Sequence, residues 1–413
     1  MSVLLKNVTI IDVSSSYHQK SVDVFYKNGA IESIGKKLTV KAKSTVDAKG
    51  KYLSKAWIDT LAGWGSPGYE HRETIQTGGA AAANGGFGSV ILVPNNLPVT
   101  DTASDVQYLL KEKDKINIQI FPLGAVSKKL EGKDLAEMLD MQHAGAIAFS
   151  DGWYPIQNSQ LMFKALEYVK GIDSMIVQIP IHKDLDSGAL MNEGIQSVAY
   201  GMSGAPGIAE EIIIHRDIAL ARYTNSRLHI SGVSTSAGID LIKKAKKEGV
   251  QITCSVTPFH LYYTDEAISG YDPLYKVYPV LRTKADVKAL REAVKDGVVD
   301  SIATHHKPHD WDEKVKELEY AASGMAAAET AWPMLLQSMP HLSPESWVQL
   351  FVDKPGAIFH IHQEGIEEGA RLSLTLFDID TVWELDMKSK KSRAYNVPML
   401  NQKLKGRAVL LAK

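Results

Sequence analysis

The chain has 413 residues and a mass of 45.3 kDa, a length that suits one large domain or one large domain with a small one. Hydrophobic residues make up 45% and charged residues 23%, which excludes collagen-like, coiled-coil and disordered chains. With 46 Lys and Arg against 48 Asp and Glu, the net charge is −2. No global charge therefore favours nucleic acid or an anionic membrane as a partner.

The cysteine content and the apolar runs bear on where the protein works. Cys254 is the only cysteine, so no internal disulfide can form. The N-terminus alternates like a strand and shows no basic segment followed by an apolar run, which predicts a cytoplasmic protein. No apolar stretch reaches the roughly 18 residues of a spanning helix, so we expect no membrane insertion.

The two ends of the chain carry the same kind of pattern. Residues 1–56 alternate in short runs separated by Asn28-Gly29 and Gly50, which is typical of hairpins. Alternating runs return in 366–413 as LSLTLFDID, TVWELD and LKGRAVLLAK. We expect 1–56 and 366–413 to form one small β-sandwich domain.

Between these ends, residues 57–365 show a different rhythm. Short apolar runs are each followed by a stretch rich in Ala, Leu, Lys and Glu, which predicts alternating strands and helices. Continuous apolar runs are typical of parallel strands buried on both faces. Eight such units predict an α/β fold, a (β/α)₈ TIM barrel, with these strands: WIDTLAG, SVILVPN, IQIFPLGAV, GAIAFSD, MIVQIPI, RLHISGVS, VQITCSVTP and VDSIATHH.

Reactive groups in such a barrel belong at the carboxyl ends of the strands, and the sequence there is specific. The motifs are DTLAGWGSPGYEHRET (59–74), VPNNLP (93–98), AFSD (148–151), MNEG (191–194), LHISGVST (228–235), VTPFHL (256–261), VLRTK (280–284), IATHHKPH (302–309) and LKGRAV (404–409). Together they resemble the dihydroorotase branch of the amidohydrolase superfamily, over essentially the whole chain. The resemblance implies a metal-dependent amidohydrolase-like barrel and a place in pyrimidine biosynthesis.

The departures from that family concern its zinc site. The resembling enzymes bind zinc through two histidines on strand 1, a Lys or Asp on strand 4, histidines on strands 5 and 6, and an Asp on strand 8 that is also the general acid/base. Such a set holds Zn²⁺ with an open position and generates hydroxide near neutral pH. Asp151 keeps the strand 4 position, whereas the other positions fall on Leu61, Gly63, Ile179, Gly232 and His305. We therefore expect no zinc, no other cofactor and no catalytic residue.

Two alternatives at this site stay open on the sequence. His182 lies three residues beyond Ile179, so a small shift could make it the strand 5 ligand, and the cluster of His305, His306 and His309 could rebuild a metal site. Asp151 could also cap the helix that follows it or pair with His305. The remaining groups are expected to form a vestigial pocket, made of Asn95, Asp151, Arg282, His305, His306 and His309. Large side chains in the mouth loops could fill the former substrate space, namely Trp64, Trp153 and Tyr154.

Three functions follow from these patterns. The first is an inactive dihydroorotase-like protein, retained as a structural or regulatory partner of aspartate transcarbamoylase, because some families of this kind keep such a chain. The second is a divergent dihydroorotase or cyclic amidohydrolase that hydrolyses a C–N bond with Asp151 and His305 as an acid/base pair. The third is a sensor that grips a small molecule through Asn95, His306 and His309. We expect a homo-oligomer, a dimer, in the first case.

Overall fold

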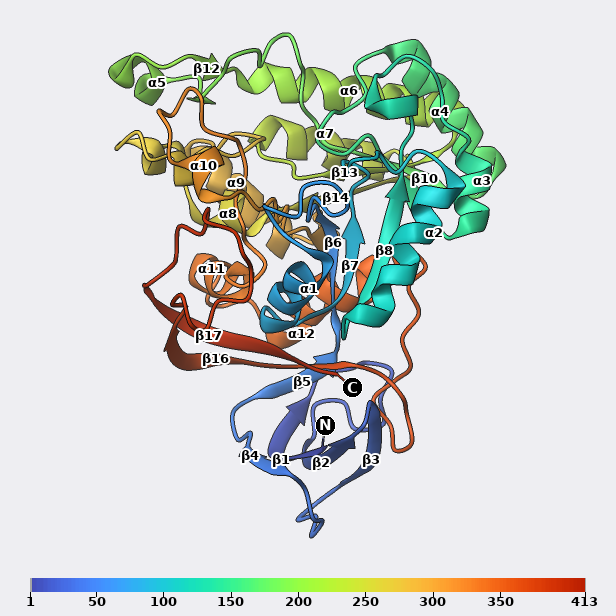
Figure 1. Cartoon of the computed structure of the whole chain (residues 1–413), viewed down its shortest axis with the longest axis vertical. Coiled ribbons are helices and arrows are strands. Elements are labelled where there is room, and N and C mark those ends of the chain that lie inside the picture. Colours follow the sequence, from blue (N-terminus) through green and yellow to red (C-terminus); the bar gives the residue numbers. More distant parts are fainter. Residues whose placement is uncertain (1, 413) are drawn as a thin grey trace.

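The computed structural model describes residues 2–412, and strands from both ends of the chain meet in one sheet (Figure 1). Its seven strands run in the order β17-β16-β5-β1-β2-β3, with β4 paired to β1. The β5 strand pairs antiparallel with β16, which joins the N-terminal and C-terminal pieces. The strands are β1 (Ser2–Ile10), β2 (Ser21–Lys27), β3 (Ala30–Gly35), β4 (Ser44–Asp47), β5 (Tyr52–Lys55), β16 (Leu374–Glu384) and β17 (Lys403–Leu411).

The second sheet has eight strands in the order β6-β7-β8-β9-β10-β13-β14-β15, all paired in parallel. A parallel bridge between Ala62 and His306 brings the last strand beside the first. The predicted (β/α)₈ barrel is thus confirmed. The strands are β6 (Trp57–Ala62), β7 (Phe87–Leu92), β8 (Gln119–Gly124), β9 (Ala148–Phe149), β10 (Met175–Gln178), β13 (Arg227–Ser231), β14 (Ile252–Val256) and β15 (Ser301–Ile302).

Helices follow the strands, and several begin at a threonine cap. Thr74, Thr102, Thr235 and Thr283 each accept a hydrogen bond from a backbone N–H in the first turn, which fixes where these helices start. The outer helices are α1 (Ile75–Asn84), α2 (Ala103–Glu112), α3 (Met138–Ala144), α4 (Ser159–Gly171), α6 (Gly207–Thr224), α7 (Ser236–Lys247) and α9 (Lys284–Lys295).

Further short elements lie in the connections and after β15. A two-stranded ribbon with one helix follows β10: β11 (Met191–Asn192), α5 (Ile195–Tyr200) and β12 (Gly204–Ala205). The remaining helices are α8 (Pro258–Tyr262), α10 (Trp311–Lys314), α11 (Ala331–Ser338), α12 (Pro344–Val348) and α13 (Lys354–Ile358). Single-turn or irregular helices are η1 (Lys113–Lys115), η2 (Lys128–Leu130), η3 (Asp265–Ile268), η4 (Pro273–Tyr275) and η5 (Gln349–Asp353). No helix in 2–412 combines the length and apolarity needed to cross a bilayer.

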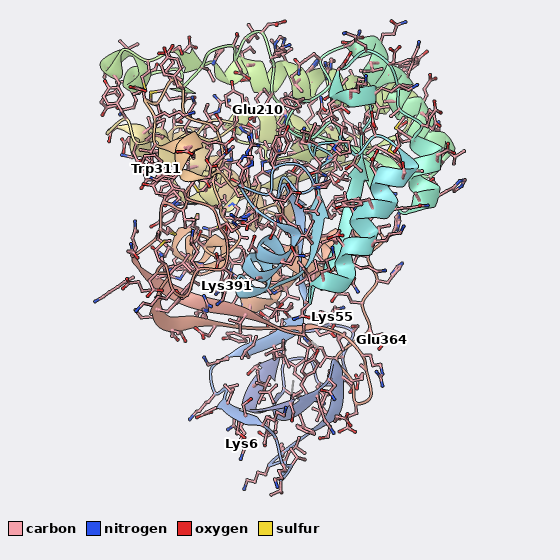
Figure 2. All side chains as sticks on the ribbon, viewed as in Figure 1. Lys6, Lys55, Glu210, Trp311, Glu364 and Lys391 are labelled. Atoms are coloured by element: carbon pink, nitrogen blue, oxygen red, sulfur yellow. The ribbon has the colours of Figure 1, made fainter. Side chains whose placement is uncertain are left out.

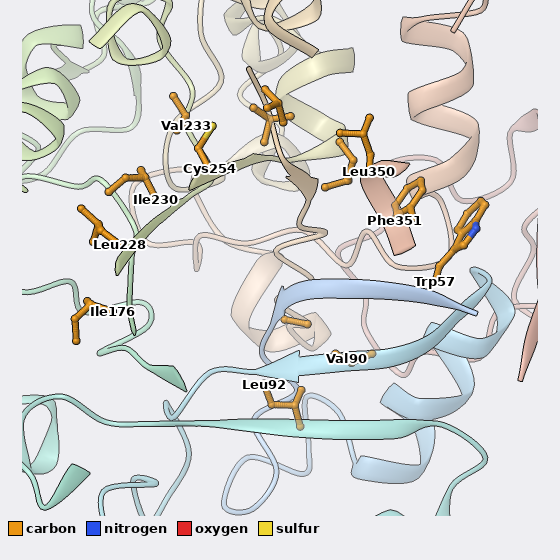
Figure 3. Packing of buried hydrophobic residues seen from close by; sticks show 14 of the residues in the cluster. Trp57, Val90, Leu92, Ile176, Leu228, Ile230, Val233, Cys254, Leu350 and Phe351 are labelled. Carbon is orange, nitrogen blue, oxygen red and sulfur yellow. The ribbon is translucent and has the colours of Figure 1, made fainter. Parts of the chain in front are cut away.

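The largest apolar cluster lies between the barrel strands and the helices (Figure 3). At one end of it, the ring of Trp57 stacks on Phe351 with centroids 4.4 Å apart and planes 6° apart. Both rings are fully buried, and such burial stabilises by about 1.5–3 kcal/mol per large side chain. This contact ties β6 to η5, a segment that packs against both β6 and β15.

An ion-pair group connects the terminal sheet with the barrel. Lys55, at the end of β5, lies where the two units meet (Figure 2). Its Nζ is 3.3 Å from Asp12 Oδ1 and 3.8 Å from Asp353 Oδ1. Since Asp12 follows β1 and Asp353 ends η5, one ammonium links the sheet to the barrel wall.

Candidate functional site

The interior of the barrel is divided into an apolar half and a polar half. Side chains alternate along the strands, except at the register shift between Asp59 and Ala62 in β6, and Val90, Leu92 and Ile176 belong to the cluster packed against the helices (Figure 3). An apolar cluster fills the side of β6 to β10 and includes residues just past the ends of β7 and β10: Ile58, Leu61, Ile91, Val93, Leu123, Ala148, Met175, Val177 and Ile179. On β13 to β15 the polar side chains are His229, Ser231, Thr253, Ser255 and Ser301.

The ligand positions on the first barrel strand, β6, and just after it lie in the apolar half. Leu61 is fully buried in the cluster with Ile91 and Val93. At Gly63, an added Cβ would come within 2.9 Å of both Trp153 Nε1 and Val93 Cγ2. Side-chain space at this position is therefore already taken by Trp153.

The ligand positions just after the fifth and sixth barrel strands, β10 and β13, are closed in the same way. Ile179 is fully buried in the apolar cluster. Gly232 has φ +78°, and a Cβ there would lie 2.4 Å from His305 Cε1. The His305 ring thus fills the space in which a strand 6 ligand would stand.

His305 belongs to a chain of hydrogen bonds through the polar half of the barrel. Its Nε2 is 2.9 Å from Ser231 Oγ, which is 3.1 Å from Ser255 Oγ. Ser255 Oγ lies 3.3 Å from His229 Nε2, and His229 Nδ1 is 2.8 Å from Thr253 Oγ1. Burial lowers the pKa of both His305 and His229 to about 3, so both rings are neutral at pH 7.

Asp151, the retained ligand position, is engaged elsewhere. Its Oδ1 accepts hydrogen bonds from the backbone N–H groups of Val126 and Ser127, both at 2.9 Å, and its Oδ2 accepts one from Ser127 Oγ. Burial raises the pKa of this carboxyl to about 6 against the opposing effect of these bonds. Asp151 therefore neither caps the following helix, which begins after Asn158, nor pairs with His305, and both of those sequence expectations are wrong.

Two members of the expected pocket, Asn95 and Arg282, hold loops together. Asn95 donates to the Asp151 carbonyl at 3.2 Å and accepts from the Trp153 N–H at 3.0 Å. Arg282, only 3% exposed, donates through Nε to Ser234 Oγ and through Nη1 to Asn192 Oδ1 and the Ala205 carbonyl. The two Nη1 bonds, to Asn192 in β11 and Ala205 in β12, anchor this ribbon to the barrel.

His306 and His309 lie in the segment that follows β15. His306 Nδ1 accepts from the Ala328 N–H at 3.2 Å, and its Nε2 lies 3.6 Å from Glu73 Oε2. His309 Nδ1 is 2.8 Å from Glu313 Oε2, and its Nε2 is 3.0 Å from the Ser323 carbonyl. His305, His306 and His309 point into separate networks, so they do not converge on one metal position.

His182 does not supply the missing strand 5 ligand. Its Nδ1 accepts from the Leu185 N–H at 3.4 Å within its own loop. Within residues 2–412, one set of three potential ligand side chains converges, with donor atoms within 4.8 Å of each other: His71, Asp310 and Glu313. Glu313 already binds Arg72 and His309, so this set at the rim does not replace the lost centre.

The aromatic side chains expected at the mouth take different roles. Trp153 lies edge-on to His305 with ring centroids 5.5 Å apart, and the Lys307 ammonium stands 5.1 Å from the Trp153 ring centroid. Burial lowers the pKa of Lys307 to about 8. Tyr154 is 66% exposed, and Trp64 packs against Gly78 of α1.

Two contributors to the site were missed from the sequence. Ser231 is the partner of His305, and the strand alternation of RLHIS, which sets His229 and Ser231 on one face, could have indicated it. Asp59 accepts from the Thr304 N–H at 2.8 Å and so ties β6 to the segment that follows β15. Burial raises the pKa of Asp59 to about 6.

The residues present do not fit the zinc of the resembling enzymes. Two of the six positions hold fully buried aliphatic side chains, two hold glycines whose side-chain space is occupied, and the imidazole at a fifth is hydrogen-bonded to a serine. Zn²⁺ needs several N, O or S ligands around one point. Asp151 alone among these positions retains its ligand type.

Comparison with known proteins places the chain in a family. It is 37% identical over 402 residues to a dihydroorotase of Ruminiclostridium cellulolyticum, covering 96% of this chain and 94% of that one. The chain belongs to the dihydroorotase family. A dihydroorotase of Pelotomaculum thermopropionicum is 38% identical over 411 residues, covering 98% and 96% of the two chains. Residues 50–237 match the Dihydro-orotase-like family.

Solved structures share the fold. The L-hydantoinase (dihydropyrimidinase) of Arthrobacter aurescens superposes with a TM-score of 0.84 at 24% identity, covering 99% of this chain and 94% of that chain. A D-hydantoinase superposes with a TM-score of 0.81 at 17% identity, covering 100% and 94%. At sequence identities of 24% and 17%, the similarity to these two structures shows a shared fold.

Proposed function

We propose that this member of the dihydroorotase family is catalytically inactive and serves pyrimidine biosynthesis as a structural or regulatory partner of aspartate transcarbamoylase. The observation that carries the proposal is the filling of the former metal centre. Trp153 and His305 occupy the side-chain space at Gly63 and Gly232, while Leu61 is sealed in the apolar half of the barrel. Substituted ligands alone could leave an open pocket, but here the surrounding side chains have closed it.

The chemistry of the closed centre supports inactivity. Water bound to zinc has a pKa near 7, whereas free water, with a pKa of about 15.7, is not a usable nucleophile at neutral pH. A positioned general acid or base contributes a further factor of roughly 10² to 10⁴. His305 stands at the general acid/base position, but it is 2% exposed and its Nε2 is taken up by Ser231.

The alternative function, a divergent hydrolase of cyclic amides, receives less support. It relies on Asp151 and His305 acting as a pair, yet Asp151 is bound to Val126 and Ser127. A pair whose members are each held by other groups cannot exchange a proton directly. A metal-free hydrolase would also need a group to polarise the carbonyl, and Lys307, beside the Trp153 ring, is one cation at the mouth.

Association is the property to test. The chain and the aspartate transcarbamoylase of the same cell would be co-expressed with a tag on one partner, then analysed by size exclusion with light scattering. We expect one complex with integer stoichiometry, and the chain alone as a homodimer. The His305→Ala variant should assemble equally, since a buried interior group does not face a partner. Separate elution of the two proteins at micromolar concentration would contradict the proposal.

A further inference from the structure

A cavity of about 710 Å³ lies among the loops at the carboxyl ends of β8, β9 and β10. The volume falls in the range of about 300–1,000 Å³ that is typical of small-molecule sites. Its wall includes the rings of Trp153, Tyr154 and Tyr278 and the side chain of Ile181. It therefore has the aromatic, concave character of a ligand site.

The cavity is separate from the former metal centre. Trp153 belongs to its wall, and the same ring lies edge-on to His305 on the barrel interior. His305, His306 and His309 are not part of the wall as far as residues 2–412 show. Closure of the metal centre by Trp153 thus leaves the outer loops with a cavity of their own.

The charged groups of the wall are unequal in sign. Three carboxylates, on Glu131, Asp184 and Asp186, face two ammonium groups, on Lys133 and Lys183. Lys133 Nζ is bound to Glu131 Oε2 at 3.0 Å, so those two charges offset each other. The wall retains two carboxylates against one ammonium, a net negative charge.

Asp186 provides an unused acceptor in this wall. The residue is 7% exposed, and its Oδ2 accepts from the His182 N–H at 3.2 Å. Its Oδ1 is buried and has no hydrogen-bond partner within the described part of the chain. Buried polar atoms are nearly always paired, so this unpaired oxygen lacks a donor. Because the oxygen is closed to solvent, a donor in the adjoining cavity reaches it once the Asp186 side chain rotates toward that cavity.

We propose that this cavity binds a small planar organic cation of the amidinium or aminoheterocycle class. The aromatic walls offer stacking and cation–π contacts to such a group, as they do to guanidinium and ammonium groups. Its N–H donors supply the bond that Asp186 Oδ1 lacks, and its charge matches the surplus carboxylate. The inference goes beyond the proposed partner function and does not depend on it.

Benzamidine is the probe, and two compounds of nearly the same shape are its controls. Benzamide is neutral and benzoate is anionic, so the three differ in charge and donors. In isothermal titration calorimetry with the full chain, we expect benzamidine to bind about tenfold or more tighter than benzamide, as a charge-assisted hydrogen bond implies. Benzoate should bind more weakly than either. Equal binding of the three, or no detectable binding of benzamidine, would overturn the proposal.

Two variants locate the binding. Asp186→Asn removes the charge while an amide oxygen can still accept from His182, and Tyr154→Ala removes a ring that is 66% exposed, so folding should be kept. Each should weaken benzamidine binding by roughly tenfold. The matched controls, Asp240→Asn and Tyr320→Ala, alter exposed residues outside the wall and should leave binding unchanged. Tight binding that survives both cavity variants would refute this location.

Discussion

The claim that His305 fills the side-chain space at Gly232, just after β13, can be tested by adding one methyl group at this glycine. Gly232→Ala faces two costs: a φ of +78°, which disfavours any L side chain by about 1–2 kcal/mol, and a Cβ 2.4 Å from His305 Cε1. Overpacking in a filled core costs about 1–3 kcal/mol. The sum predicts a loss of unfolding free energy of about 2–5 kcal/mol.

The chain offers a matched control. Gly249 has the same φ of +78° but has no atom within 4 Å of an added Cβ, so Gly249→Ala should cost only the backbone part, about 1–2 kcal/mol. Urea unfolding, followed by circular dichroism, would measure both. In a His305→Ala background the contact is gone, so the cost of Gly232→Ala should fall by about 1–3 kcal/mol. Equal losses at Gly232 and Gly249, with no coupling to His305, would refute the claim that His305 fills this space.

Three further predictions address the core and the buried ionisable groups. Trp57→Ala should lower the unfolding free energy by about 3–5 kcal/mol, whereas Trp311→Ala, at a ring 57% exposed, should change it by less than about 0.5 kcal/mol in the same urea assay. Burial lowers the pKa of Lys314 to about 7, so above that pH the unfolded chain binds more protons than the folded chain. The urea midpoint of the wild type should therefore rise relative to that of Lys314→Met between about pH 7 and about pH 9. A constant difference between the two midpoints would count against the burial effect. Because the pKa of His305 is lowered to about 3, its ring nitrogen shifts in NMR should stay those of neutral imidazole from about pH 8 to about pH 5, and a titration with a midpoint of about 6.5 would show an exposed ring.

The barrel could be predicted from the sequence because its strands are buried on both faces. Such strands carry continuous apolar runs, and each of the eight runs overlaps a barrel strand, although β9 and β15 are only two residues long in the structure. The pairing of the two chain ends in one sheet was also readable, since both ends alternate with a period of two. These signals are local and depend on the burial of each residue.

The partners of the site residues could not be predicted, because they depend on register between separate strands. Asp151 is held by Val126 and Ser127, which follow the neighbouring strand β8, and no local pattern distinguishes this from a helix cap. His305 meets Ser231 across the barrel, 74 positions away in the chain. The sequence could show that ligands were replaced, but only the structure shows that Trp153 and His305 occupy their space.

The most direct test of the central claim is dihydroorotate turnover, measured as both ring opening and ring closure on purified protein from zinc-supplemented medium. The metal content is determined on the same sample. We predict no turnover above background and far less than one zinc per chain. Turnover accompanied by stoichiometric, chelator-resistant zinc would contradict the claim, because the positions of Leu61, Gly63, Ile179, Gly232 and His305 could not then have lost the metal centre.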